Sequence, residues 1–303
     1  MVAKSLMAAG LSRWGKMAMR FPWRTHDGES REAHAWPAEN PRAVVACIHG
    51  LSGSGEQFHP LPSRLSSYSF FALDLRGQGS DPVVTRRGMS LDLPTQLRDI
   101  GQFLSALRRA HVGKPLFLMG ESMGSLLSAA YAAQDDLPPE GEIDGVLLSV
   151  PVVGLRREVP RFLKRTLNFL AHHFPQARLS PSRFVNGKTT APPLTRDTAY
   201  QESLREKPHH LRGFSLGFLA ELGALIDNSH THAERLRHPA LVLAAGNDCF
   251  VKPDQIQSWF DQVSSTDKTH RLYPEAYHLL WHDWDREMVM KDIEDWLDAR
   301  CGR

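Results

Sequence analysis

Five short apolar runs recur along this chain, and each has the length and composition of a strand buried in a parallel sheet. They are AVVACI at 43–48, SFFALD at 69–74, PLFLMG at 115–120, DGVLLSV at 144–150 and PALVLAA at 239–245. Helical apolar patterns, such as the one over residues 97–107, lie between and after them. This alternation predicts an α/β fold with a mostly parallel central sheet flanked by helices. Before the first run, residues 19–36 predict two antiparallel strands joined around Asp27-Gly28.

The alternation is interrupted between residues 152 and 238, where Pro, Arg and His are frequent and the clearest patterns are helical. A helical insertion between two core strands is expected to cover the carboxyl edge of the sheet, where open α/β sheets bind ligands. The sequence therefore predicts an α/β core in two parts, residues 1–151 and 239–303. Residues 152–238 are predicted to form a helical cap over the carboxyl edge of the sheet.

Positive charge gathers in two parts of the chain, although the formal net charge is only +2. The predicted cap carries fourteen Arg or Lys against seven Asp or Glu, and the first 26 residues carry five Arg or Lys and no acid. Such basic segments favour peripheral contact with an anionic membrane surface or attraction of acidic substrates. They form no recognised nucleic-acid-binding motif, so nucleic acid is not an expected partner.

The cysteines bear on the compartment. Cys47, Cys249 and Cys301 are an odd, sparse set without metal-ligand spacing, which argues against a disulfide scaffold and fits a reducing compartment. No apolar run approaches the roughly 20 residues that span a bilayer. The start of the chain also lacks the long apolar core of a secretory signal and is interpreted as a loosely ordered leader, with weak membrane-surface contact as the alternative. The predicted location is the cytoplasm, with peripheral membrane association as a possible addition.

The segment Gly120-Glu121-Ser122-Met123-Gly124 fits the pattern G-x-S-x-G, with an apolar strand before it and a helix-forming stretch after it. A serine at such a strand-to-helix turn takes a strained backbone conformation, and small residues are needed two positions away on either side. The turn exposes the hydroxyl at the amino end of the next helix, where developing negative charge is favoured. The pattern predicts Ser122 as a catalytic nucleophile.

A serine nucleophile needs a base, and the base needs an acid that orients it. In this type of fold the chain order is serine, acid, histidine. Asp248 follows the strand at 239–245, and His278 follows a short strand around residues 271–273. They are predicted as the acid and the base. The alternatives are Asp254 and Asp261, which lie where a helix is expected, and His282, which lies inside the following segment.

Two backbone N–H groups are needed to stabilise the oxyanion. One is expected from Met123, the residue after the nucleophile, and the other from Leu51 in the loop HGLSGSGEQF at 49–58. Ser52 and Ser54 are interpreted as residues that shape this loop, because no strand-to-helix turn surrounds them.

These residues together resemble the α/β-hydrolases, and most closely the monoacylglycerol lipase and lysophospholipase-like group. The resemblance spans residues 27–296. It rests on DG at 27–28, HGLSGSGEQF at 49–58, LDLRGQGSD at 73–81, GKPLFLMGESMGS at 113–125, IDGVLLSVP at 143–151, GNDCFV at 246–251 and EAYHLL at 275–280. It implies the same serine, acid, histidine and oxyanion positions as the residues themselves.

The chain departs from the group's usual pattern at three positions: Glu121 and Gln78 replace histidines, and Ser125 replaces a glycine. The charge of Glu121 beside the nucleophile is expected to pair with an arginine, with Arg76 as the candidate. The cap has no clear match to the lipid-selective cap of the group, so it does not identify the substrate.

The predicted function is serine ester hydrolysis of medium or long acyl chains, including monoacyl lipids, through an acyl-enzyme and without a metal or organic cofactor. An acyl pocket under the cap is predicted from Phe214, Phe218, Leu219 and Leu222, with ordinary helix packing as the alternative for this stripe. A thioesterase or acyltransferase would use the same triad, and a binding protein on a hydrolase fold is the non-enzymatic alternative. The oligomeric state is left open.

Overall fold

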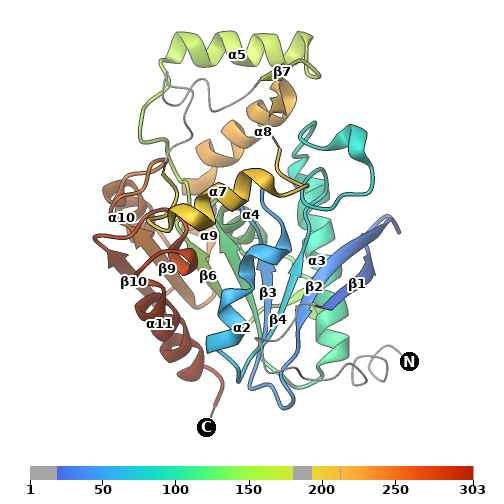
Figure 1. Ribbon diagram of the computed structural model, residues 1–303, viewed down its shortest axis with the longest axis vertical. Coiled ribbons are helices and arrows are strands. Elements are labelled where there is room, and N and C mark those ends of the chain that lie inside the picture. The colour runs from blue at the N-terminus through green and yellow to red at the C-terminus, as the bar shows by residue number, and fades with distance from the viewer. Residues whose placement is uncertain (1–18, 180–192, 212, 303) are drawn as a thin grey trace.

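A computed structural model describes residues 19–179, 193–211 and 213–302, and the first 18 residues, predicted as a leader, lie outside them (Figure 1). Its central sheet has eight strands in the order β1-β2-β4-β3-β5-β6-β9-β10. They are β1 (Met19–Arg24), β2 (Ser30–Trp36), β3 (Val44–Ile48), β4 (Ser69–Leu73), β5 (Leu116–Glu121), β6 (Gly145–Ser149), β9 (Ala240–Ala245) and β10 (Lys268–Tyr273). All five apolar runs form strands of this sheet, as predicted.

The sheet is parallel from β4 to β10, and β2 is antiparallel to both β1 and β4. The antiparallel start predicted for residues 19–36 is therefore confirmed. Strands β3 to β6 and β9 are buried along their whole length, which explains why they are apolar at successive positions and show no alternation.

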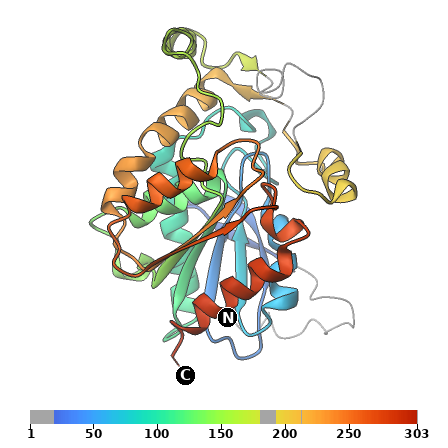
Figure 2. The ribbon, with the colours of Figure 1, turned by 90° about the vertical axis from the view of Figure 1, so that its left-hand side faces the viewer.

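Helices cover both faces of the sheet (Figures 1 and 2). One face carries α3 (Leu93–Ala110), α4 (Met123–Ala132), α9 (Ser229–Arg235) and α10 (Pro253–Asp261); the other carries α2 (Pro60–Arg64) and α11 (Arg286–Asp298). Short 3-10 turns lie at η2 (Gly55–Phe58), η3 (Val84–Arg86), η4 (Pro139–Gly141) and η5 (Leu280–His282). Ile100, Leu104 and Leu107 of α3 are buried, so the predicted apolar stripe of this helix does face the core.

The described residues between β6 and β9 form mostly helices. They include α5 (Arg161–His173), β7 (Arg178–Leu179), α7 (Thr198–Glu206), β8 (Phe214–Ser215), α8 (Leu216–Asp227) and α9. Strands β7 and β8 form a two-residue antiparallel pair, which the sequence did not predict because a ladder this short leaves no periodic pattern. Figure 1 shows α5 at the end of the molecule farthest from the sheet, while α9 packs against α4. The boundaries proposed for the cap, 152–238, stay a prediction.

None of the helices in the described parts of the chain combines the length and the apolar character that crossing a membrane requires.

Candidate active site

Ser122 lies alone between the last residue of β5 and the first residue of α4, with φ 56° and ψ −117°. This is the strained turn that the sequence predicts, and a non-glycine residue in such a conformation costs roughly 1–3 kcal/mol. Hydrogen bonds hold the turn: the Ser122 N–H donates to the Ser149 carbonyl at 2.8 Å, and the Ser125 hydroxyl reaches the Gly120 and Ser149 carbonyls, both at 2.8 Å. Ser125, where the related group has glycine, therefore stabilises the turn.

The glycines on either side of the turn are required by space. A Cβ atom at Gly120 would overlap the carbonyl of Gly124, and one at Gly124 would overlap the carbonyls of Ile48 and His49. Backbone atoms of β3 thus approach the first turn of α4 too closely for any side chain.

Asp248 and His278 come together at the carboxyl edge of the sheet, in the loops after β9 and β10. Nδ1 of His278 donates to Oδ2 of Asp248 at 2.5 Å, and both side chains are buried. The other carboxylate oxygen accepts the N–H groups of Phe250 and Val251, at 2.6 and 3.1 Å. Burial opposes charge on His278, but the charge and hydrogen bond of Asp248 outweigh it and raise the pKa of the imidazole. The pair is arranged to stabilise a protonated imidazole.

The loop after β3 lies against the nucleophile turn. A Cβ atom placed on Gly50 would lie 3.2 Å from Cβ of Ser122 and 3.8 Å from its Oγ. Leu51, half-buried, is the next residue, and Met123 is buried on the other side of Ser122. The structure therefore brings both predicted oxyanion residues next to Ser122.

The loop is further held by His49. Its Nδ1–H donates to the Gly50 carbonyl at 2.7 Å, and its Nε2 accepts the N–H of Leu75 at 3.0 Å. The sequence analysis does not predict this role of His49, for which the only signal is its position before Gly50.

The alternative acid and base residues are engaged elsewhere. His282 donates from Nε2 to the Gln57 carbonyl at 2.7 Å, and the Tyr200 hydroxyl lies 2.9 Å from the same nitrogen. Burial lowers the pKa of His282 to about 3, so it stays neutral. Asp254 and Asp261 lie on α10, and Asp261 accepts a hydrogen bond from Gln257.

The expected ion pair between Glu121 and Arg76 is wrong. Arg76 instead binds Asp27, Glu29 and Asp99, acids that come from the β1–β2 turn and from α3. Glu121 is fully buried, and its Oε2 has no hydrogen-bond partner among the described residues. Burial raises the pKa of this carboxyl to about 8, opposed by interactions with His278 and Gln57. Burial therefore favours the neutral form of the Glu121 carboxyl and reduces the charge beside Ser122.

Phe214 and Phe218 are buried in the hydrophobic core with their ring centroids 4.7 Å apart, and Leu219 and Leu222 pack against it partly buried. This is the packing role that the sequence left as the alternative. Their role in an acyl pocket stays a prediction.

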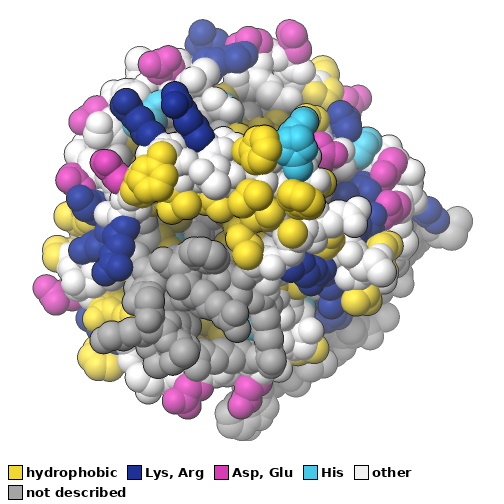
Figure 3. Space-filling view, turned by 90° about the horizontal axis from the view of Figure 1, so that it is seen from above, with side chains coloured by type: hydrophobic (Ala, Val, Ile, Leu, Met, Phe, Trp, Pro, Cys, Tyr) yellow, Lys and Arg dark blue, Asp and Glu magenta, His cyan; other side chains and the backbone are white. Residues whose placement is uncertain are grey.

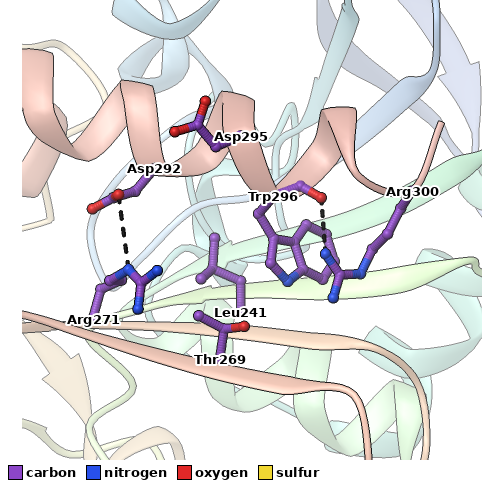
Figure 4. A pocket seen from close by; sticks show the side chains of 7 residues that line it. All are labelled: Leu241, Thr269, Arg271, Asp292, Asp295, Trp296 and Arg300. Carbon is purple, nitrogen blue, oxygen red and sulfur yellow. Dashed lines mark hydrogen bonds and ion pairs between the residues drawn. The ribbon is translucent and has the colours of Figure 1, made fainter. Parts of the chain in front are cut away.

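Two of the hollows that the described residues form lie against α11. The smaller, about 210 Å³, lies between α11 and strands β9 and β10 (Figure 4). It is lined by Leu241, Thr269, Arg271, Asp292, Asp295, Trp296 and Arg300. Leu241 is near the amino end of β9, away from the loop that carries Asp248, so this hollow does not belong to the site. The larger, about 430 Å³, is lined by Tyr200, Trp281 and His282 among others and opens beside α2 and α11.

One group of metal-ligating side chains lies close together in the described ranges, namely His26, Asp27 and Asp99. The guanidinium of Arg76 already binds both carboxylates, and His26 hydrogen-bonds Asp99 at 2.6 Å. These contacts make the group an ion-pair network.

The sequence family described as "Serine aminopeptidase, S33" matches residues 39–285. The phospholipase YtpA of Bacillus subtilis is 28% identical over 269 residues, which cover 87% of this chain and 98% of that protein. A monoacylglycerol lipase of Mycolicibacterium smegmatis is 25% identical over 265 residues, 86% of this chain and 90% of that protein.

Among solved structures, a soluble variant of monoglyceride lipase from Saccharomyces cerevisiae in complex with a substrate analog is similar, with a TM-score of 0.81. It is 22% identical, and the match covers 97% of this chain and 98% of that one. The likeness confirms the predicted α/β-hydrolase fold.

Proposed function

This chain belongs to the serine aminopeptidase S33 family of α/β-hydrolases, and from that membership we propose that it hydrolyses carboxylic esters through a serine acyl-enzyme. The observation that carries the proposal is the strained turn at Ser122, at the same sheet edge as the buried Asp248–His278 pair. Ser122 is the nucleophile, His278 the base and Asp248 the acid of this mechanism.

The reaction proceeds in two halves. Oγ of Ser122 attacks the ester carbonyl while Nε2 of His278 takes its proton, and Asp248 stabilises the imidazolium. The N–H groups of Leu51 and Met123 donate to the oxyanion. His278 returns the proton to the departing alcohol, and a water molecule then releases the acyl group by the same steps. The neutral carboxyl of Glu121 suits this site, because a carboxylate beside the serine would oppose the developing negative charge.

The substrate is an ester of a single medium or long acyl chain, such as a monoacylglycerol or lysophospholipid. The support is that the relatives named above are a phospholipase and a monoacylglycerol lipase, which match 87% and 86% of this chain. A series of esters of increasing acyl length distinguishes a lipid substrate from a small ester.

We expect the chain to hydrolyse p-nitrophenyl esters and monoacylglycerols with an optimum at eight or more acyl carbons, which is measured as kcat/KM from acetate to palmitate. Acyl thioesters and aminoacyl anilides serve as comparison substrates, since the same triad could act on either. Faster turnover of a thioester or an anilide at matched acyl groups would contradict ester hydrolysis as the main activity. An optimum at acetate would contradict the lipid substrate and leave a small-ester hydrolase.

The exposed face of α5 supports peripheral contact with a membrane. Phe162 and Phe169 are 72% and 62% exposed, and Phe174, just past the helix, is 60% exposed. Arg161 and Arg165 lie on the same helix. Figure 3 looks down on this end of the molecule and shows hydrophobic side chains beside Lys and Arg. Aromatic rings beside cations are the combination that binds an anionic lipid surface.

Replacing Phe162 and Phe169 together by serine is expected to reduce binding to vesicles of phosphatidylglycerol and phosphatidylcholine by about tenfold, because buried apolar area drives such binding. Sedimentation with vesicles measures the change. Val112→Ser, which alters another highly exposed apolar residue just after α3, is the matched control and should bind as the native chain does. Equal binding of all three proteins, or binding unaffected by salt between 20 and 500 mM, would contradict this contact.

A further inference from the structure

The loop that carries Leu51 makes a tight turn. The Gly53 N–H donates to the Gly50 carbonyl at 3.1 Å, which places Leu51 and Ser52 at the two central positions. Ser52 has φ 64°, the left-handed conformation that the second central residue of a type II turn requires. Glycine is usual at that position, and a serine there adopts the conformation only at a cost in free energy. A contact from outside the turn is therefore needed to stabilise the left-handed conformation of Ser52.

Gln78 provides that contact. Its side-chain carbonyl Oε1 accepts the N–H of Ser52 at 2.7 Å, and the side chain is fully buried in the loop after β4. In a type I turn the peptide between Leu51 and Ser52 would be rotated, and its N–H would no longer point to this acceptor. The buried amide thus favours one of the two orientations of that peptide.

The other end of the same amide faces the nucleophile turn. Nε2 of Gln78 lies 4.0 Å from the sulfur of Met123, the residue after Ser122. One buried side chain therefore touches both segments that carry the proposed oxyanion donors, Leu51 and Met123.

Gln78 is itself held in place by the backbone. Its N–H donates to the Leu75 carbonyl and its carbonyl accepts the Asp81 N–H, both at 3.0 Å. On the side facing the cap, the Ser52 hydroxyl accepts the N–H of Leu211 at 2.8 Å. Ser52 is bound from the core by Gln78 and from the opposite side by the segment before β8.

We propose that Gln78 is a positioning residue for the oxyanion hole: by accepting the Ser52 N–H it holds the left-handed turn in place against the core, and with it the position of Leu51, whose N–H is the proposed oxyanion donor. This inference rests on the proposed function. The oxyanion hole stabilises the transition state and not the bound ester, because the oxyanion forms only during the reaction. A change at Gln78 is therefore expected to affect kcat more than KM.

The test replaces Gln78 by methionine, which keeps the length and approximate volume of the side chain and removes the acceptor. We expect kcat on the preferred ester to fall about 10–100-fold, somewhat less than the loss of a whole oxyanion donor, with KM changed less than threefold. A trifluoromethyl ketone with the same acyl chain, which forms a tetrahedral adduct, should lose affinity by the same factor as kcat/KM.

Gln96→Met is the matched control. Gln96 is a buried glutamine of α3 whose Nε2 donates to the carbonyl of Arg76 at 2.9 Å. It therefore supports the loop after β4, which also carries Gln78, but does not contact Ser52. Its kcat should stay within about twofold of the native value. Equal losses in the two variants would show that the loop needs only general support, and would overturn the assignment.

Two further variants keep the test decisive if Gln78→Met folds poorly. Gln78→His retains an acceptor nitrogen and should keep more activity than the methionine variant. In a Ser52→Gly background, where glycine takes the left-handed conformation freely, the Gln78→Met change should cost less in kcat. Full additivity of the two changes would count against the proposal.

The outcomes also separate this inference from the proposed function. Native activity that Ser122→Ala abolishes but Gln78→Met leaves intact overturns only the role of Gln78. A native chain that hydrolyses none of the esters overturns the proposed function, and the role of Gln78 with it.

Discussion

Ser122→Ala is expected to lower kcat for ester hydrolysis by about 10⁶-fold, the loss observed when a triad nucleophile is removed. The Ser122 hydroxyl is the group proposed to form the acyl-enzyme, and the nearby Ser125 hydroxyl is already hydrogen-bonded to the carbonyls of Gly120 and Ser149. The measurement is hydrolysis of the preferred p-nitrophenyl ester, together with covalent labelling by a fluorophosphonate. Labelling should disappear along with the activity.

Ser128→Ala is the control for this variant. Ser128 is a buried serine of α4, six residues beyond Ser122, and its hydroxyl has no hydrogen-bond partner among the described residues. Removing that hydroxyl should leave kcat unchanged and should not destabilise the fold. Residual labelling of Ser122→Ala at the native rate would assign the nucleophile to another residue and refute the mechanism.

Gly124→Ala is expected to lower the free energy of unfolding by about 3 kcal/mol and the melting temperature by about 5 °C. The added methyl group would overlap the carbonyls of Ile48 and His49, which belong to backbone that cannot move aside without shifting the end of β3. Thermal unfolding followed by circular dichroism measures the effect. Activity should fall as well, since the same shift would displace the loop that carries Leu51.

Gly223→Ala makes the same chemical change where there is room. Gly223 lies inside α8, and a Cβ atom there would have no atom within 4 Å. Alanine has the higher helix propensity, so stability should rise by about 0.5–1 kcal/mol. Similar melting temperatures for the two variants would contradict the close approach of Gly124 to the backbone of Ile48 and His49.

The positions of the buried strands along the chain and the turn at Ser122 could be predicted from the sequence because both depend on short local patterns. Each buried strand is a run of apolar residues, and the turn at Ser122 needs its two glycines within five positions. The partners Asp248 and His278 were predicted from chain order, and the structure places them in hydrogen-bond contact. Their catalytic roles, and those of Leu51 and Met123, stay predictions until the variants are measured.

Contacts between distant segments could not be predicted in this way. Arg76 is predicted to pair with Glu121, but it binds three acids from the β1–β2 turn and from α3. No pattern in the sequence indicates that Asp27 and Asp99 lie close together. The bond between Gln78 and Ser52 joins two loops 26 residues apart. Such pairings depend on how β3 and β4 lie side by side, which only the folded sheet determines.

The segment between β6 and β9 leaves and re-enters the sheet at neighbouring strands: the Val150 N–H donates to the Leu243 carbonyl at 2.8 Å. The entropy of closing a loop grows only with the logarithm of its length, so doubling the segment costs roughly 0.6 kcal/mol. A single contiguous exchange could therefore replace everything between these strands with a longer or shorter sequence. Ser122, Asp248 and His278 all lie outside it, so such an exchange would leave the three residues proposed to react unchanged.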